Sequence, residues 1–152
     1  MITDEQRQRI VSIAVSQIGV REATGNNDGV PIEKYAGGRQ AAWCAYFVMW
    51  CYRQAGVELP GNRWLLPKVE YMEQQLQLHA FWAPSSDVWP QPGDLVFFTS
   101  RRQSDKGPGR HVGIVEFVDG DRVHTVEGNT GNAVRRRSYH VDSSYITGYG
   151  WM

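Results

Sequence analysis

Four side chains in this sequence are of the types that carry out acyl transfer through a thiol, namely Cys44, His111, Glu127 and Asn129. Cys44 follows Trp43 and opens an apolar run, so we expect it at the N-terminus of a buried helix, where the helix dipole favours the thiolate. A thiolate attacks carbonyl carbon, and a histidine within reach can take its proton. His111 is the candidate base, and Glu127 or Asn129 would hold its imidazole and so select the tautomer. The pattern predicts a thiol hydrolase.

The hairpin that carries His111 and Glu127 decides whether the two side chains can meet. Opposed residues of an antiparallel pair share a face of the sheet. A three-residue loop at Asp119–Asp121 sets His111 opposite Asn129 and leaves Glu127 as a diagonal neighbour on the same face. A two-residue Asp-Gly loop moves Glu127 to the other face. A catalytic pair therefore predicts a loop of odd length here, unless a bulge shifts the register.

Helical patterns occupy the first half of the chain and strand patterns the second. Thr3 and Gln6 form a capping box at the start of a helix that Gly19 can end. A second helix is expected from residue 42 or 43 to Ala55, and a third from about Leu66 to Leu78. Five short β-rich runs follow: Leu95–Thr99, His111–Val118, Arg122–Val126, Val134–His140 and Ile146–Trp151. This order predicts an α+β fold, one domain over residues 1–152, with N-terminal helices packed on a C-terminal antiparallel sheet.

The two cysteines, Cys44 and Cys51, are predicted to be free thiols. On one helix their separation places the Cα atoms about 10.5 Å apart, and a disulfide needs less than about 7 Å. No Cys-x-x-Cys or His-x-x-x-His pair supports a zinc site. The run Asn26–Gly29 lacks the alternating acidic ligands of a calcium loop and is interpreted as a turn. We therefore expect neither a metal nor a cofactor.

The composition bears on the classes of partner. The formal net charge is zero, with 16 basic and 16 acidic residues, which leaves no electrostatic footprint for nucleic acid or an anionic membrane. No stretch approaches the roughly 20 apolar residues of a membrane span. The N-terminus begins with acidic residues and lacks the apolar core of a secretory signal peptide. We expect a monomer made in the cytoplasm, which would act on an external substrate such as the cell wall only after delivery.

The order of these motifs resembles the CHAP family of cysteine- and histidine-dependent amidohydrolases and peptidases, which are papain-like cell-wall hydrolases. The resemblance covers nearly the whole chain, and its most specific pieces are the Trp43-Cys44 helix, Pro92-Gly93-Asp94 and His111-Val112-Gly113. Such family members cleave amide bonds of peptidoglycan, within the stem peptide or cross-bridge or between sugar and peptide. The resemblance implies Cys44 as nucleophile, His111 as base, Glu127 as its orienting residue and Asn129 as a further polar member of the site.

One position departs from the family pattern. Many members have glutamine directly before the nucleophile, whereas this chain has Trp43 there and Gln40 four residues before Cys44. Loss of one oxyanion donor costs about 10²–10³ in rate, so the missing glutamine matters unless another donor replaces it. The backbone N–H of Cys44, at the helix N-terminus, is well placed to stabilise the oxyanion.

Two other functions compete with this interpretation. A papain-like transglutaminase or deamidase acting on protein would use the same triad, because water or an amine can capture the thioester. A non-catalytic wall-binding module would keep the fold, although the intact set of Cys44, His111 and Glu127 argues against it. The biological setting is also open among a phage lysin, an injected toxin with its immunity protein and delivery machinery, and the catalytic part of a larger protein.

Overall fold

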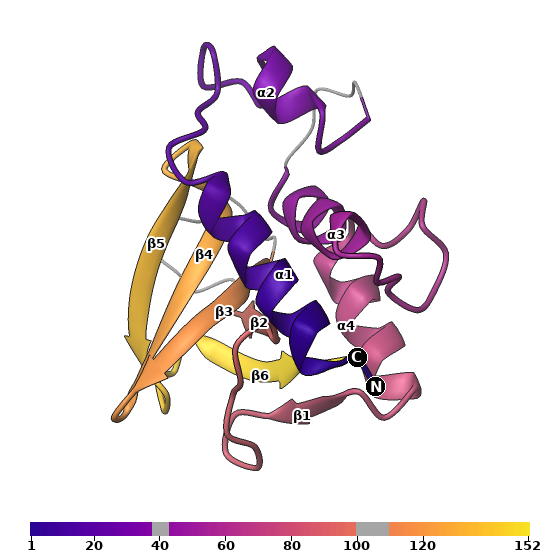
Figure 1. Cartoon of the computed structure of the whole chain (residues 1–152), viewed down its shortest axis with the longest axis vertical. Helices are drawn as coiled ribbons and strands as arrows, with labels where there is room; N and C mark the ends of the chain where they lie inside the picture. The colour runs from indigo at the N-terminus through magenta and orange to yellow at the C-terminus, as the bar shows by residue number, and fades with distance from the viewer. Residues whose placement is uncertain (38–42, 100–109) are drawn as a thin grey trace.

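The computed structural model describes residues 1–37, 43–99 and 110–152, and within these ranges the chain forms four helices and six strands (Figure 1). The helices are α1 (Asp4–Ser16), α2 (Val30–Glu33), α3 (Cys44–Gln54) and α4 (Val69–Leu78). The strands are β1 (Trp82–Pro84), β2 (Leu95–Phe98), β3 (His111–Asp119), β4 (Arg122–Thr130), β5 (Ala133–His140) and β6 (Ile146–Gly150). All pairings are antiparallel, in the order β1-β6-β2-β3-β4-β5. The predicted α+β class is confirmed.

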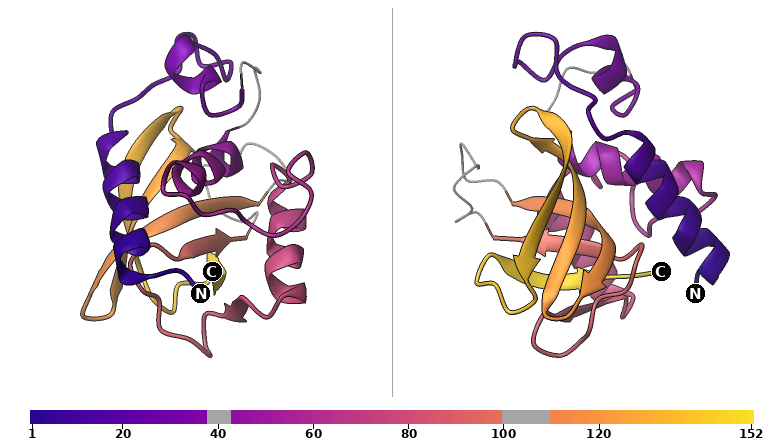
Figure 2. Two further views of the ribbon diagram at one scale, coloured as in Figure 1. Left: turned by 45° about the vertical axis from the view of Figure 1, so that its right-hand side comes forward. Right: turned by 60° about the vertical axis from the view of Figure 1, so that its left-hand side comes forward.

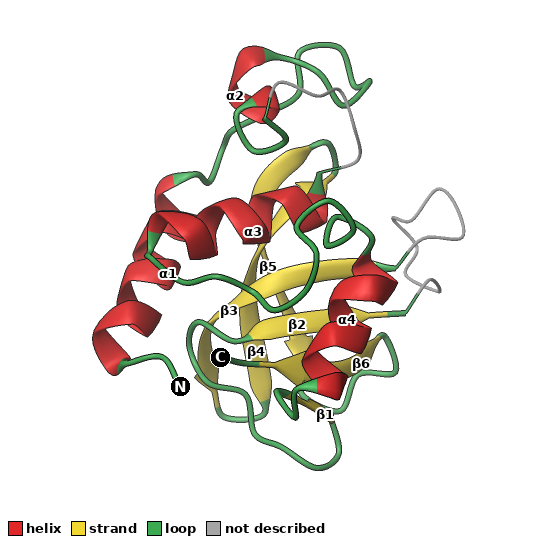
Figure 3. Ribbon diagram, turned by 90° about the vertical axis from the view of Figure 1, so that its right-hand side faces the viewer, coloured by secondary structure: helices red, strands yellow, loops and turns green. Residues whose placement is uncertain are grey.

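The sheet has a different apolar cluster on each face. Helices α1, α3 and α4 cover one face, as Figures 2 and 3 show from three sides. Strand residues on this face include Leu95, Phe97, Val112, Ile114 and Val126. The other face carries a smaller cluster that includes Val96, Phe98, Val115, Val123 and Tyr149. This alternation along β2 and β3 follows from the two-residue period of a strand with both faces buried.

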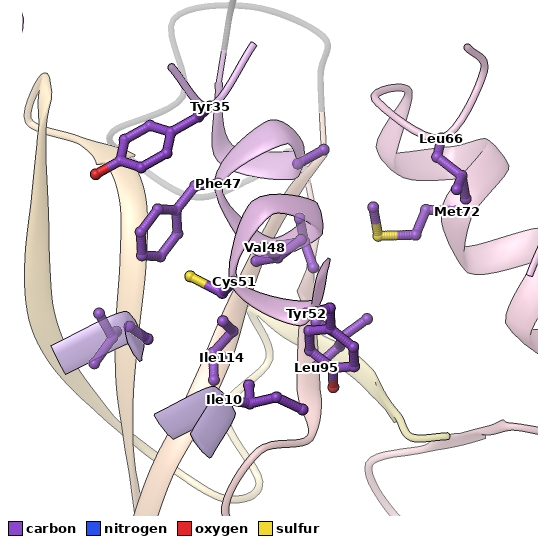
Figure 4. Close-up of a cluster of buried hydrophobic side chains, with 14 of the residues drawn as sticks. Ile10, Tyr35, Phe47, Val48, Cys51, Tyr52, Leu66, Met72, Leu95 and Ile114 are labelled. Atoms are coloured by element: carbon purple, nitrogen blue, oxygen red, sulfur yellow. The ribbon is translucent and has the colours of Figure 1, made fainter. Parts of the chain in front are cut away.

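Helix α3 is central to the larger cluster. Its buried side chains are Ala45, Phe47, Val48, Cys51 and Tyr52. Figure 4 shows Phe47 and Cys51 directed into the cluster beside Ile114 of β3 and Ile10 of α1. Burying a large apolar side chain stabilises a fold by about 1.5–3 kcal/mol, so these contacts hold the N-terminus of α3 firmly against the sheet. No helix in the described part of the chain combines the length and the apolar character needed to cross a membrane.

The Pro92-Gly93-Asp94 segment ties α1 to the start of β2. Asp94 Oδ1 lies 2.6 Å from Arg7 Nη1, and Asp94 Oδ2 accepts the backbone N–H of Gln91 at 2.8 Å. Gly93 adopts φ +88°, and a Cβ on it would lie 3.2 Å from Arg7 Cα, so glycine suits both the conformation and the close approach. The segment therefore holds the helical layer on the sheet.

The predicted capping box of α1 is present, whereas α4 and β1 differ from the prediction. Helix α4 begins at Val69 rather than Leu66. The reason is a separate turn in which Asn62 O accepts the backbone N–H groups of Leu65 and Leu66. Strand β1 was not predicted; it pairs with β6 at the edge of the sheet, which is where a strand containing Pro84 is tolerated.

The loop between β3 and β4 is shorter than predicted. Asp119 pairs with Arg122, so the loop consists of Gly120 and Asp121 alone. Gly120 adopts φ +59°, a conformation that suits the first position of a tight two-residue hairpin. The odd-length loop is predicted only without a bulge, so the pairing along β3 decides whether His111 and Glu127 share a face.

A bulge in β3 restores the register that the short loop would have changed. The pairing shifts between Val115 and Phe117, so Glu116 is the additional residue on β3. Beyond the bulge Val115 pairs with Thr125, which places His111 and Glu127 on the same face. The side-chain arrangement is thus the predicted one, reached through a different loop and a bulge.

Candidate active site

Cys44 is the first residue of α3, and it is half-buried. Trp43 precedes it without making a side-chain cap, and its indole N–H donates instead to Glu22 Oε1 at 2.7 Å. Backbone N–H groups of Val112 and Ala45 donate to the sulfur. The thiol therefore lies at a helix N-terminus, whose first N–H groups have no carbonyl partner within the helix, in a setting that favours the thiolate.

His111 is the first residue of β3 and connects Cys44 with Glu127. Its Nε2 lies 2.8 Å from Glu127 Oε1, and both residues are buried. The ring also hydrogen-bonds with the Cys44 thiol, and because Nε2 faces Glu127 this contact falls to Nδ1. Phe98 packs against the imidazole, with ring centroids 5.5 Å apart. Thiol, imidazole and carboxylate are thus connected in the order that a nucleophile, its base and an orienting group require.

Two hydroxyl groups hold Glu127 in turn. Thr125 Oγ1 donates to Glu127 Oε2 at 2.5 Å, and Tyr139 OH donates to the same oxygen at 3.0 Å. Oε1 is thereby left to face His111. Thr125 could have been found from its position two residues before Glu127 on one strand, but Tyr139 becomes a neighbour only through the pairing of β4 with β5. Neither was predicted.

These contacts shift the pKa values of Cys44 and His111 toward an ion pair. Burial by itself raises the pKa of the Cys44 thiol, but the hydrogen bond and charge of His111, with two backbone N–H groups, outweigh burial and lower it. Burial by itself lowers the pKa of His111, whereas hydrogen bonds to Cys44 and Glu127 and their charges raise it to about 9. Both shifts favour a thiolate beside an imidazolium over the neutral pair.

This constellation lies within a recognised family domain. Residues 35–129, which include all four predicted site residues, match the CHAP domain.

The chain belongs to the CHAP domain family.

Membership confirms the resemblance seen in the sequence and identifies the domain as a cysteine-dependent hydrolase with a papain-like fold.

Several solved structures share this fold. Ly7917 is 21% identical with a TM-score of 0.59, and the match covers 94% of this chain and 60% of that one. NlpC1 from Trichomonas vaginalis is 14% identical with a TM-score of 0.55, covering 99% and 45% respectively. An N-acetylmuramoyl-L-alanine amidase from Staphylococcus aureus is 20% identical with a TM-score of 0.51, covering 72% and 32%. This chain thus spans about 60% of the length of Ly7917. No curated protein sequence matches it.

Two glycines of the CHAP domain leave room for the site. A Cβ on Gly113 would lie 2.7 Å from Glu127 Cγ, so the glycine of the His-Val-Gly segment makes space for the orienting carboxylate. A Cβ on Gly128 would lie 2.6 Å from the Phe47 Cβ, so glycine there lets β4 approach α3 closely. Both distances are shorter than nonbonded carbon atoms normally approach.

Gly113→Ala is expected to destabilise the domain by about 1–3 kcal/mol, because the added methyl group overpacks a site that cannot expand freely. Displacement of Glu127 should also lower activity. Chemical denaturation of Gly113→Ala, Glu127→Ala and the double variant measures the coupling between the two positions. The alanine at 127 lacks the Cγ that the new methyl group would meet, so the two costs should be less than additive. Fully additive costs would contradict the proposed steric contact.

Removing the hydroxyl groups that hold Glu127 is expected to slow catalysis. Thr125→Val and Tyr139→Phe should each lower kcat by about 3–10-fold, since each deletes one hydrogen bond to a buried carboxylate. The double variant should lose more than either single variant, with little change in KM. Steady-state kinetics check this, with Tyr145→Phe as an exposed control. Unchanged kcat in the double variant would show that Glu127 needs no such support.

Asn129 and the other histidines lie outside the connected set. Asn129 adopts φ +55° at the irregular end of β4, and in the described residues it makes no hydrogen bond to His111 or Glu127. Its role as a further polar member of the site stays a prediction. His79 hydrogen-bonds to Gln75 O, His140 contacts Asp121, and His124 stacks on Phe117.

Cys51 and the Asn26–Gly29 run have structural roles. Cys51 is a buried free thiol whose pKa burial raises, which makes it a poor nucleophile beside Cys44. In the turn, Asp28 accepts hydrogen bonds from the backbone N–H and the hydroxyl of Thr24, at 2.9 and 2.6 Å. The described part of the chain holds no cluster of three or more His, Cys, Asp or Glu side chains arranged for a metal.

Proposed function

We propose that this CHAP domain hydrolyses an amide bond of peptidoglycan, as an endopeptidase or an N-acetylmuramoyl-L-alanine amidase, through a thioester on Cys44. The observation that carries the proposal is the connection of a half-buried thiol to an imidazole that a buried carboxylate holds. Two similar structures have names in keeping with it. One is an N-acetylmuramoyl-L-alanine amidase, and Ly7917 was solved with the hydrolyzing product of MDP.

In the proposed mechanism the Cys44 thiolate attacks the amide carbonyl carbon, and a C–S bond forms as the carbonyl oxygen becomes an oxyanion. The C–N bond then breaks while His111 Nδ1 gives its proton to the leaving amine. Water attacks the resulting thioester as His111 takes a proton from it, which releases a carboxylic acid and regenerates the thiolate. Throughout, Glu127 accepts the Nε2–H of His111 and keeps the ring in the orientation that serves both steps.

The backbone N–H of Cys44 is the proposed oxyanion donor. At the start of α3 this group has no partner within the helix, and the helix dipole adds to its effect. The Trp43 indole does not take this role because it already donates to Glu22. Gln40, the other candidate from the sequence, lies outside the described residues.

The pH dependence of kcat/KM is expected to show two limbs. Because the pKa of the Cys44 thiol is lowered, the thiolate persists well below the ordinary thiol pKa of about 8.5, and so does activity. His111 is protonated below its raised pKa and deprotonated above it, so kcat/KM should decline as the pH rises through about 9. Initial rates measured across this pH range check the prediction. A single rise near the ordinary thiol pKa with no decline at higher pH would contradict it. Both apparent pKa values belong to the coupled pair of Cys44 and His111 rather than to either residue alone.

Digestion of purified peptidoglycan in ¹⁸O-labelled water tests the proposed reaction. Hydrolysis should release fragments that carry one new amine and one new carboxyl group with a single ¹⁸O atom, at one type of amide bond. Mass spectrometry then also identifies which bond is cut. Fragments joined to a second amine without ¹⁸O would instead indicate a transglutaminase, and unchanged peptidoglycan would contradict the proposal.

Action on the cell wall also implies a route to it. We propose delivery either as a phage lysin or as an injected antibacterial effector accompanied by an immunity protein. The test compares two forms of the chain expressed in a bacterial host, one fused to a periplasmic export signal and one unfused. The export fusion should lyse the cells and the unfused chain should not, and equal tolerance of both would count against a wall substrate in that host.

A further inference from the structure

Glu22 lies outside the triad, yet its carboxylate is bonded to the residue that precedes the nucleophile. Oε1 accepts the indole N–H of Trp43, directly before Cys44, at 2.7 Å. Oε2 accepts the backbone N–H of Asn27 at 3.1 Å, which ties the acid to its own loop. The backbone N–H of Glu22 donates at 3.0 Å to Asn132 O, in the turn between β4 and β5. Glu22 therefore connects the N-terminal loop and the end of the β4–β5 hairpin to the start of α3.

The Trp43 ring is enclosed by its neighbours. Its side chain is fully buried, and the ring stacks on that of Tyr35 with the centroids 5.8 Å apart. The ring also lies close to β4, since a Cβ on Gly128 would be 3.0 Å from Trp43 Cζ3. A buried N–H needs a hydrogen-bond acceptor, because a donor without one keeps the full cost of losing water. Glu22 supplies that acceptor and so selects the orientation in which the indole is buried.

The position of Trp43 sets where α3 begins. Trp43 is the N-cap residue, and its carbonyl oxygen accepts the N–H of Phe47 at 2.8 Å, whereas its side chain makes no cap. The entry of the chain into α3 is therefore held by the buried indole. The sulfur of Cys44, the next residue, contacts the imidazole of His111 and the N–H of Val112, both on β3. A displaced Trp43 would move the thiol away from these groups.

We propose that Glu22 is a positioning residue for the nucleophile: it holds the Trp43 indole, and the indole in turn holds Cys44 against β3. This assignment rests on Cys44 as the nucleophile of the proposed reaction. The two ideas can nevertheless fail separately, because the reactivity of the thiol is measurable without any substrate.

The proposed action of Glu22 is geometric, and its sign differs from that of a direct charge effect. A negative charge near a thiol disfavours the thiolate, so removal of the charge alone would lower the thiol pKa. The contacts with His111 and with two backbone N–H groups are what lower the pKa of the Cys44 thiol. Displacement of Cys44 from these contacts would therefore raise the thiol pKa.

The test measures the pH midpoint of Cys44 alkylation by iodoacetamide, resolved by residue with mass spectrometry. Glu22→Ala should raise the midpoint by about one pH unit, toward the ordinary thiol value of about 8.5. Turnover of peptidoglycan should fall about tenfold through kcat, with KM nearly unchanged. Cys51 reports on folding in the same sample, because it is wholly buried and reacts only when the domain opens. Thr24→Val, the matched control, removes the 2.6 Å bond to Asp28 from the same loop and should leave the midpoint in place.

A double-mutant cycle tests whether Glu22 acts through the indole. Trp43→Phe keeps an aromatic ring and deletes the N–H that Glu22 accepts. It should raise the midpoint as Glu22→Ala does, and combining the two changes should cause no further rise. Should Glu22→Ala fail to fold, Glu22→Gln takes its place, because its single carbonyl oxygen must serve both the Trp43 and the Asn27 N–H groups. Its midpoint should also rise, by a smaller amount.

Three results would overturn the proposal. An unchanged midpoint in Glu22→Ala, with Cys51 still protected, would leave Glu22 a purely structural residue of its loop. A lower midpoint in either Glu22 variant would reveal a direct effect of the charge. An equal rise in the wild-type and Trp43→Phe backgrounds would show an action independent of the indole. Peptidoglycan left intact by the wild type would count against the proposed function, and the alkylation midpoints would still decide about Glu22.

Discussion

Cys44→Ala is expected to lower turnover of purified peptidoglycan by at least about 10⁴-fold while the domain stays folded. The physical reason is that no other side chain in the connected set can form the covalent intermediate: His111 is the proton carrier and Glu127 faces it from a fully buried position. The change removes one small polar atom from a half-buried position at a helix terminus, so the cost in stability should be small. Initial rates with equal amounts of wild type and variant measure the loss.

Cys51→Ala is the matched control for that experiment. Cys51 lies on the same helix, but it is wholly buried and its pKa is raised, so it cannot replace Cys44 as nucleophile. Its replacement should cost about 1 kcal/mol of stability through lost packing and leave kcat nearly unchanged. Activity that survives Cys44→Ala but disappears in Cys51→Ala would reverse the assignment of the nucleophile.

Glu127→Gln is expected to lower kcat/KM by on the order of 10³-fold, although the side chain keeps its size. Thr125 and Tyr139 both donate to Oε2, so a glutamine would place its carbonyl oxygen there and turn its NH₂ group toward His111. The NH₂ group donates, which favours His111 with Nε2 unprotonated and the proton on Nδ1. In that tautomer the ring cannot accept a proton from Cys44, and loss of the carboxylate charge also lowers the His111 pKa.

The alkaline limb of the pH profile separates this effect from simple destabilisation. In Glu127→Gln the limb should move below its wild-type position near pH 9, since one of the causes that raise the His111 pKa is gone. Glu116→Gln on β3 is the control, because that glutamate pairs with Arg136 near the surface and has no link to the imidazole. A Glu127→Gln variant with wild-type kcat/KM would show that the carboxylate charge is dispensable.

Much of the fold follows from local patterns in the sequence. The apolar run after Trp43 predicts α3 and the position of Cys44 at its N-terminus, because a helix that is apolar nearly all round must be central. The capping box predicts α1 in the same way, since Thr3 and Gln6 satisfy each other's backbone partners. Strands β2 to β6 follow from β-rich runs between turn residues, whereas β1 has only three residues and includes a proline.

The register between His111 and Glu127 shows where local patterns stop being sufficient. The short loop and the Glu116 bulge each move the pairing by one residue, in opposite directions, and alternation of residue types does not reveal a bulge. The hydrogen bond from Tyr139 to Glu127 likewise cannot be predicted from sequence patterns, because it depends on the pairing of β4 with β5. Gly113 appeared as part of a motif, but its reason, space for Glu127, needed the folded arrangement.

The most direct test of the central claim, an activated Cys44 paired with His111, is the rate of cysteine alkylation as a function of pH, resolved by residue with mass spectrometry. We expect iodoacetamide to modify Cys44 of the wild type at a pH below the range of an ordinary thiol while Cys51 stays unmodified, because the thiol pKa of Cys44 is lowered, whereas Cys51 is wholly buried and its pKa is raised. In His111→Ala the reaction of Cys44 should shift to the pH range of an ordinary thiol, near pH 8.5. Wild-type Cys44 that reacts only in that higher range, or that reacts no faster than Cys51, would contradict the claim.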